Sequence, residues 1–113
     1  MTLHNAYLIV FDFLNNFFFR ARRENDSFAS LLSDMDPYLF GDNQMPADPA
    51  VWSDWEMCVE KVCASDNDIR PEELKPLVFT FLNYYMSEFG FELEDVIAAL
   101  QSDPDLDLKL NTN

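Results

Sequence analysis

Glycine is nearly absent from this sequence, in which Gly41 and Gly90 are the only two among 113 residues. A phosphate-binding loop needs several glycines within a few positions, so that backbone amides can approach the phosphate groups. The sequence has no such cluster. Histidine is rarer still, because His4 is the only one, and no serine–histidine–aspartate set can be assembled around it. We therefore do not expect the chain to be an enzyme.

Cysteine is also rare, and its spacing argues against a disulfide. Cys58 and Cys63 lie five residues apart on one predicted helix, so their side chains point about 140° apart. We interpret both as reduced packing residues of a cytoplasmic protein. A long uninterrupted apolar run is missing too: the apolar stretch 6–19 contains Asp12, and basic residues follow it rather than precede it. Neither a signal peptide nor a membrane span is predicted.

Positive charge is in short supply, with 7 lysines and arginines against 21 acidic residues and a formal net charge of -14. Nucleic acid and anionic lipid would be repelled at long range, so neither is an expected partner. A positively charged macromolecule is therefore the expected binding partner. The charge also exceeds the magnitude of roughly 2 to 8 that solubility alone requires in a small domain, which favours a role in binding.

The apolar residues that are present predict a folded, all-α protein. Apolar side chains make up 49% of the sequence and include 11 phenylalanines, which excludes a disordered acidic tail. Their spacing of three and four residues predicts a single-domain bundle of about five helices joined by acidic loops. The expected helices span about 3–22, 26–36, 48–62, 76–89 and 93–101. Residues 1–104 form the expected domain, and 105–113 are expected to be a loose tail or an edge strand.

Helix ends are predicted by their capping residues. Asp26 or Ser27 can cap the second helix, and Asp48 followed by proline is a strong start for the third. Gly90 is expected to end the fourth helix, since glycine tolerates a left-handed conformation. In the third helix the apolar stripe places Trp55 in the core and Trp52 nearer its edge.

Two clusters of charged residues resemble ligand-binding sites, but we interpret neither as one. Arg20, Arg22 and Arg23 lie at the C-terminal end of the first helix, where cations interact favourably with the free carbonyl groups; a phosphate site is the alternative. Among possible calcium loops, 103–107 opens with suitable aspartates but has leucine where the loop needs glycine. We expect no metal and no cofactor.

Acidic residues concentrate in the middle of the chain, where they alternate with aromatic ones. Residues 24–68 contain 11 acidic residues and one lysine, a net charge of -10. Carboxylates speed encounter with a basic partner, and aromatic rings supply anchors in an interface. The predicted partner-binding residues are Asp34, Asp36, Tyr38, Phe40, Asp42, Trp52, Asp54 and Glu56.

Three stretches resemble the small acidic immunity proteins of bacterial contact-dependent growth inhibition systems. They are residues 26–35, residues 45–55 and residues 81–90 with Asp95-Val-Ile following, and the similarity extends over about 7–101. The resemblance implies a cytoplasmic antitoxin that forms a 1:1 complex with the C-terminal domain of a cognate toxin, often a basic nuclease. It would block the active site or the substrate groove of that toxin. The alternative is an acidic chaperone or adaptor for a secreted protein, acting as a dimer.

Overall fold

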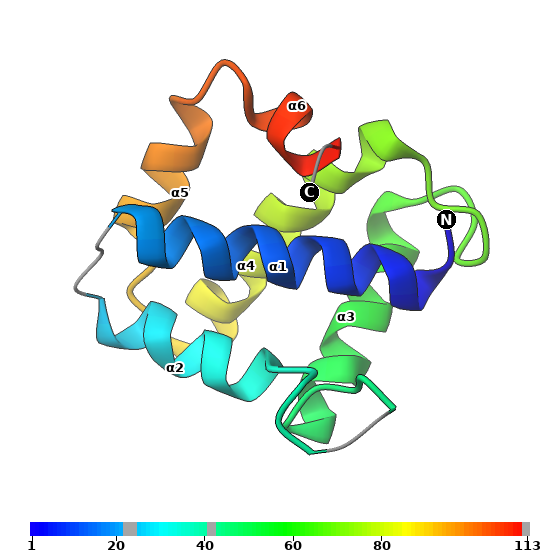
Figure 1. The fold of residues 1–113 in the computed structure, drawn as a ribbon, viewed down its shortest axis with the longest axis horizontal. Helices are drawn as coiled ribbons and strands as arrows, with labels where there is room; N and C mark the ends of the chain where they lie inside the picture. Colours follow the sequence, from blue (N-terminus) through cyan, green and yellow to red (C-terminus); the bar gives the residue numbers. More distant parts are fainter. Residues whose placement is uncertain (22–24, 41–42, 112–113) are drawn as a thin grey trace.

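Six helices account for most of the residues that the structure describes, which are 1–21, 25–40 and 43–111. No strand occurs among these residues, so the all-α prediction is confirmed in this computed structural model. The helices are α1 (Leu3–Ala21), α2 (Asp26–Met35), α3 (Pro49–Val62), α4 (Leu74–Phe89), α5 (Glu94–Gln101) and α6 (Leu106–Asn111), with a short 3-10 turn, η1, at Pro71–Glu73 (Figure 1).

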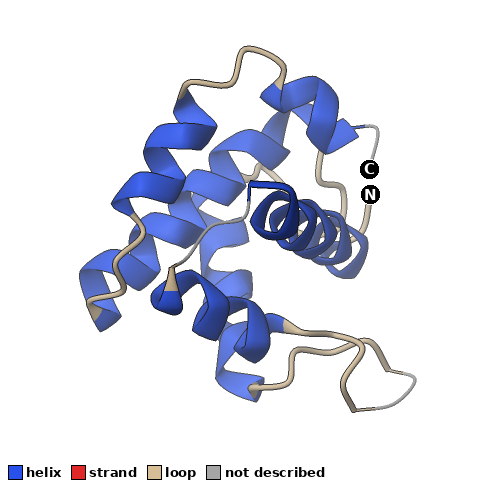
Figure 2. Cartoon of the chain, turned by 60° about the vertical axis from the view of Figure 1, so that its left-hand side comes forward, coloured by secondary structure: helices blue, strands red, loops and turns tan. Residues whose placement is uncertain are grey.

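The first helix, α1, is the centre of the arrangement. It packs against α2, α3, α4 and α6, while α3 and α4 also pack against each other. Figure 2 shows α1 nearly end-on with the other helices gathered around it. The radius of gyration is 13.1 Å, close to the ~13 Å expected for a chain of this length. No helix in the described part of the chain is long and apolar enough to cross a membrane.

The capping residues of α3 and α4 are those that the sequence predicts, whereas the cap of α2 differs. The Asp48 carboxylate accepts the backbone N–H of Ala50 at 3.0 Å, which confirms the predicted start of α3. Gly90 ends α4 with a φ of 69°, also as predicted. The cap of α2 is Asn25 rather than Asp26 or Ser27, and its side chain accepts the N–H of Phe28 at 2.9 Å. The prediction missed the cap by one position because all three side chains can perform this role.

The start of α4 is two residues earlier than expected, because Pro76 is tolerated inside it. Proline lacks an N–H group, but the amides of the first helical turn have no partner within the helix. Pro76 is the third residue of α4 and therefore removes no helical hydrogen bond. Phe89, the last residue of α4, is 55% exposed, although its spacing from Phe81, Leu82 and Tyr85 predicts that it faces the core.

The last helix, α6, contradicts the expected loose tail or edge strand. Residues Leu106–Asn111 are helical, and Leu106 and Leu110 are each only 1% exposed. Their spacing of four residues places both on the face that packs against α1 and α4. The alternation of leucines along 106–110 suggested a strand. One helical turn also buries two of these three leucines, Leu106 and Leu110.

Candidate protein-interaction surface

The end of α2 is held against the core by a buried tyrosine. The Tyr7 hydroxyl donates a hydrogen bond of 2.5 Å to the carbonyl oxygen of Met35, the last residue of α2. Burial raises the pKa of Tyr7 far above its usual value, and the negative charge of Asp36 adds to the shift. Pro37 follows and prevents the helix from continuing. The chain therefore leaves the core at a defined place and turns outward.

Residues 36–40, which we call the acidic turn, carry a carboxylate and exposed rings side by side. The Asp36 side chain accepts the N–H of Tyr38 at 2.9 Å, and the Tyr38 hydroxyl donates to Asp12 on α1 at 2.9 Å. Tyr38 remains 51% exposed, and Leu39 and Phe40 are 58% and 73% exposed. The turn is thus fixed to α1 while its apolar side chains face solvent.

The carboxylates around the acidic turn reinforce one another. The carbonyl oxygen of Asp34 accepts the N–H of Asp48 at 2.9 Å, so the end of α2 lies beside the start of α3. Burial and the nearby charge of Asp48 raise the pKa of Asp34. In the described residues no lysine or arginine forms a salt bridge with Asp12, Asp34 or Asp36. The local potential is therefore negative and open to a positively charged partner.

Trp52, Asp54 and Glu56, which were also predicted to bind a partner, do not join this surface. Trp52 is half-buried, with its ring 5.7 Å from His4 and 5.5 Å from Tyr7, so it serves in packing. Asp54 faces α4, where the Tyr85 hydroxyl donates to it at 2.6 Å. Glu56 is exposed, two residues further along α3, and such a spacing places it on another side of the helix.

Asp42 and the arginine cluster cannot be placed on this surface. Asp42, Arg22 and Arg23 lie outside the described residues, as does the side chain of Arg20. Four of the eight predicted binding residues, Asp34, Asp36, Tyr38 and Phe40, therefore come together at the end of α2.

A groove between α1 and α2, which we call the α1–α2 groove, adjoins the acidic turn. Its volume is about 370 Å³. It is lined by Phe11, Asn15, Phe18 and Phe19 of α1, by Ala29, Leu32 and Ser33 of α2, and by Asp36 and Tyr38. None of these α1 residues was among the predicted partner-binding residues. The sequence feature that indicated this site is the apolar surface of α1, which is wider than one packing stripe. It includes Phe19, whose side chain is 68% exposed.

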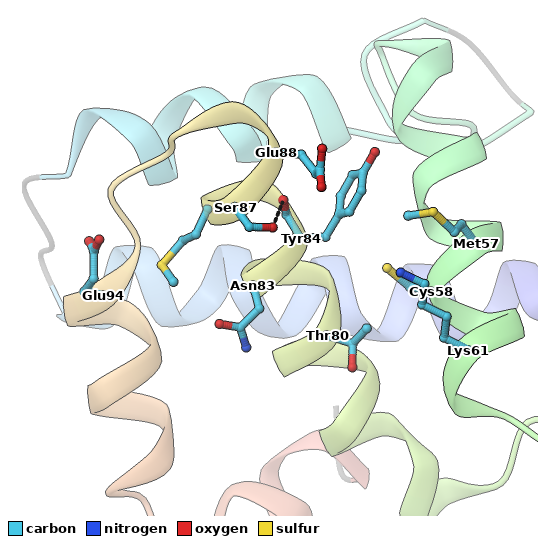
Figure 3. A pocket seen from close by; sticks show the side chains of 10 residues that line it. Met57, Cys58, Lys61, Thr80, Asn83, Tyr84, Ser87, Glu88 and Glu94 are labelled. Carbon is cyan, nitrogen blue, oxygen red and sulfur yellow. Dashed lines mark hydrogen bonds between the residues drawn. The ribbon is translucent and has the colours of Figure 1, made fainter.

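A second, larger groove lies between α3 and α4 and measures about 870 Å³. Figure 3 shows Lys61 of α3 and Glu94 of α5 on opposite sides of it. The Cys58 thiol lies in its wall, and burial raises the pKa of this thiol to about 11, so it is neutral near neutral pH. Charges of both signs are spread around the groove rather than directed at one point, which is not the arrangement of a catalytic site.

The described residues gather no group of three histidine, cysteine or acidic side chains that could hold a metal ion. Comparison with known proteins supplies no further guide: no family model matches the chain, and neither a curated protein nor a solved structure is detectably similar to it. The function is therefore argued from the surface itself.

A buried thiol predicts a loss of stability in alkali. Burial raises the pKa of Cys58 to about 11 from an ordinary value of 9.0. The thiol is neutral in the folded chain and ionises more readily when the chain unfolds. Its contribution to the free energy of unfolding is fully present below about pH 9 and is lost as the pH rises through about 11.

We expect the urea midpoint of unfolding to fall steadily between about pH 9 and about pH 11. Cys58→Ala should show a smaller fall than the parent over the same range, because it lacks one of the groups that ionise on unfolding. A midpoint that stays constant across this range in the parent chain would contradict the burial of the Cys58 thiol.

Proposed function

We propose that this protein is an immunity-type antitoxin, which binds a basic toxin domain in the cytoplasm and neutralises it by occluding the active site or substrate groove. The observation that carries the proposal is the acidic turn, where Asp34 and Asp36 flank the end of α2 beside the exposed Tyr38 and Phe40. The antitoxin performs no reaction and needs no cofactor. Binding alone accounts for inhibition.

Electrostatics and packing have separate roles in this proposal. A net charge of -14 attracts a positively charged toxin at long range and speeds its encounter. Once the proteins touch, rings such as Tyr38 and Phe40 provide the buried contact area that slows dissociation. Because Tyr38 is already fixed by Asp12 and by the edge of the Phe11 ring, little side-chain entropy is lost on binding.

Co-expression with a panel of basic nuclease toxin domains tests the function directly. We expect growth to be rescued from one toxin, and the purified pair to form a 1:1 complex whose affinity falls steeply as salt is added. Failure to rescue growth from any toxin in the panel, together with no measurable binding to these domains, would contradict the proposal.

Reversing the two negative charges at the end of α2, Asp34 and Asp36, tests whether this surface binds the toxin. We expect Asp34→Lys with Asp36→Lys to weaken toxin binding about 100-fold or more, because two attractive contacts become repulsive. The control is Glu72→Lys with Asp105→Lys, which changes the net charge equally. Both control residues are exposed, one in η1 and one just before α6, and Figure 1 shows α6 and α2 on opposite sides of α1. Equal weakening by the two pairs would show that only total charge matters.

An acidic chaperone or adaptor acting as a dimer is the second candidate. It is favoured by Phe89, which is 55% exposed and extends an aromatic group with Tyr84, Tyr85 and Phe91 at the end of α4. Light scattering, which measures the oligomeric state, distinguishes the two proposed functions. The chaperone requires a dimer in the absence of toxin, and the antitoxin does not.

A further inference from the structure

We infer that the α1–α2 groove receives an amphipathic helix of the toxin, which inserts two apolar side chains between α1 and α2 and places a lysine or arginine against Asp36. This inference rests on the proposed function and specifies which part of the partner is recognised. It also assigns a binding role to the α1 residues Phe11, Phe18 and Phe19.

The shape of the groove suits a helix. The α1 residues that line it recur at positions 11, 15, 18 and 19, so they form one stripe along two helical turns. Two turns extend about 10 Å along a helix axis. A partner helix laid in this groove would present side chains at i and i+4 over the same distance, which is the usual geometry of helix-in-groove recognition.

The groove is lined mostly by apolar side chains, with Asn15 and Ser33 among them, and is acidic at one end. Of the described residues that line it, Asp36 is the only one with a charge. Asp12 lies beside that end, because its carboxylate accepts the Tyr38 hydroxyl at 2.9 Å. An occupant that matches both features has apolar residues followed by a basic residue.

The exposed rings around the groove support an interface rather than an ordinary surface. Phe19 is 68% exposed at one end, while Tyr38, which also lines the groove, is 51% exposed at the acidic turn. Large apolar side chains gathered at a groove are typical of interaction sites. A second copy of this chain is a poor occupant, since two molecules of charge -14 repel each other. A positively charged helix satisfies the apolar contacts without this repulsion.

A titration of ¹⁵N-labelled protein with two synthetic helical peptides of about 18 residues tests the inference. The first peptide carries leucines in one helical stripe and lysines elsewhere. The second has serine in place of every leucine and the same charge. We expect the first peptide to bind at least ~10-fold more tightly and to shift the amide signals of Asn15, Ala29 and Ser33. Equal binding of the two peptides would overturn the inference, as would shifts centred on Thr80, Asn83 and Ser87 of the other groove.

A matched pair of variants connects the groove to toxin binding. Ser33→Trp fills the groove from α2, whereas Ser30→Trp places the same ring on an exposed position of the same helix that does not line it. We expect the Ser33 variant to bind both the leucine peptide and the toxin at least ~10-fold more weakly than the Ser30 variant. Equal affinity of the two variants for the leucine peptide would contradict the inference.

The failure of this inference and the failure of the proposed function can be told apart. If the parent chain rescues growth and Ser33→Trp rescues it equally, the antitoxin function stands and the groove is not its binding site. If no toxin is neutralised but the leucine peptide binds as expected, the groove is a helix-binding site and the antitoxin function is wrong.

Discussion

Replacing Trp55 with alanine is expected to lower the free energy of unfolding by about 3 to 5 kcal/mol. Trp55 is fully buried, and its ring lies edge-on against Tyr7 of α1 at 5.5 Å and against Phe81 of α4 at 5.8 Å. Its indole N–H donates to the carbonyl oxygen of Leu3 at 3.2 Å. One side chain thus joins three helices, and its removal leaves a cavity where they meet.

Urea denaturation monitored by circular dichroism measures this loss. Trp52→Ala is the matched control, because the Trp52 side chain is only half-buried and less apolar surface is exposed when it is removed. We expect Trp52→Ala to cost clearly less than Trp55→Ala. Since natural domains have only about 5 to 15 kcal/mol of stability, the Trp55 variant should be partly unfolded at physiological temperature. Equal losses for the two variants would show that Trp55 is not at the centre of the core.

Replacing Leu106 and Leu110 together with alanine is expected to cost about 4 to 10 kcal/mol, the sum of two buried leucine truncations. Both side chains are buried where α6 packs against α1 and α4. Their loss exposes part of α1 and α4 as well, because α6 covers those helices. We therefore expect the double variant to be largely unfolded in the absence of a partner.

Thermal unfolding of the double variant and of Leu39→Ala tests the position of α6. Leu39 is 58% exposed in the acidic turn, so its truncation should change stability by less than about 0.5 kcal/mol. A double variant as stable as the parent chain would mean that residues 106–111 are a loose tail, as the sequence pattern had suggested.

The candidate surface was predicted in part. Alternating carboxylates and rings identified Asp34, Asp36, Tyr38 and Phe40, which the structure places together, because a turn keeps residues close that are close in sequence. The same reasoning included Asp54 and Trp52, whose surroundings depend on other helices. Asp54 accepts a hydrogen bond from Tyr85, 31 residues away, and Trp52 packs against Tyr7. The sequence does not show which helix will face them.

By itself, the sequence determined the helical class, the Asp48 and Gly90 caps, the burial of Trp55 and the strong negative charge. These properties arise from interactions within a few residues or from composition, which do not depend on how the helices assemble. Tertiary structure alone decided that residues 106–111 form a helix, that Asp54 faces α4, and that α1 and α2 leave a groove beside Asp36. Those outcomes depend on which helices pack against one another. The packing is determined jointly by apolar residues that are far apart in the chain.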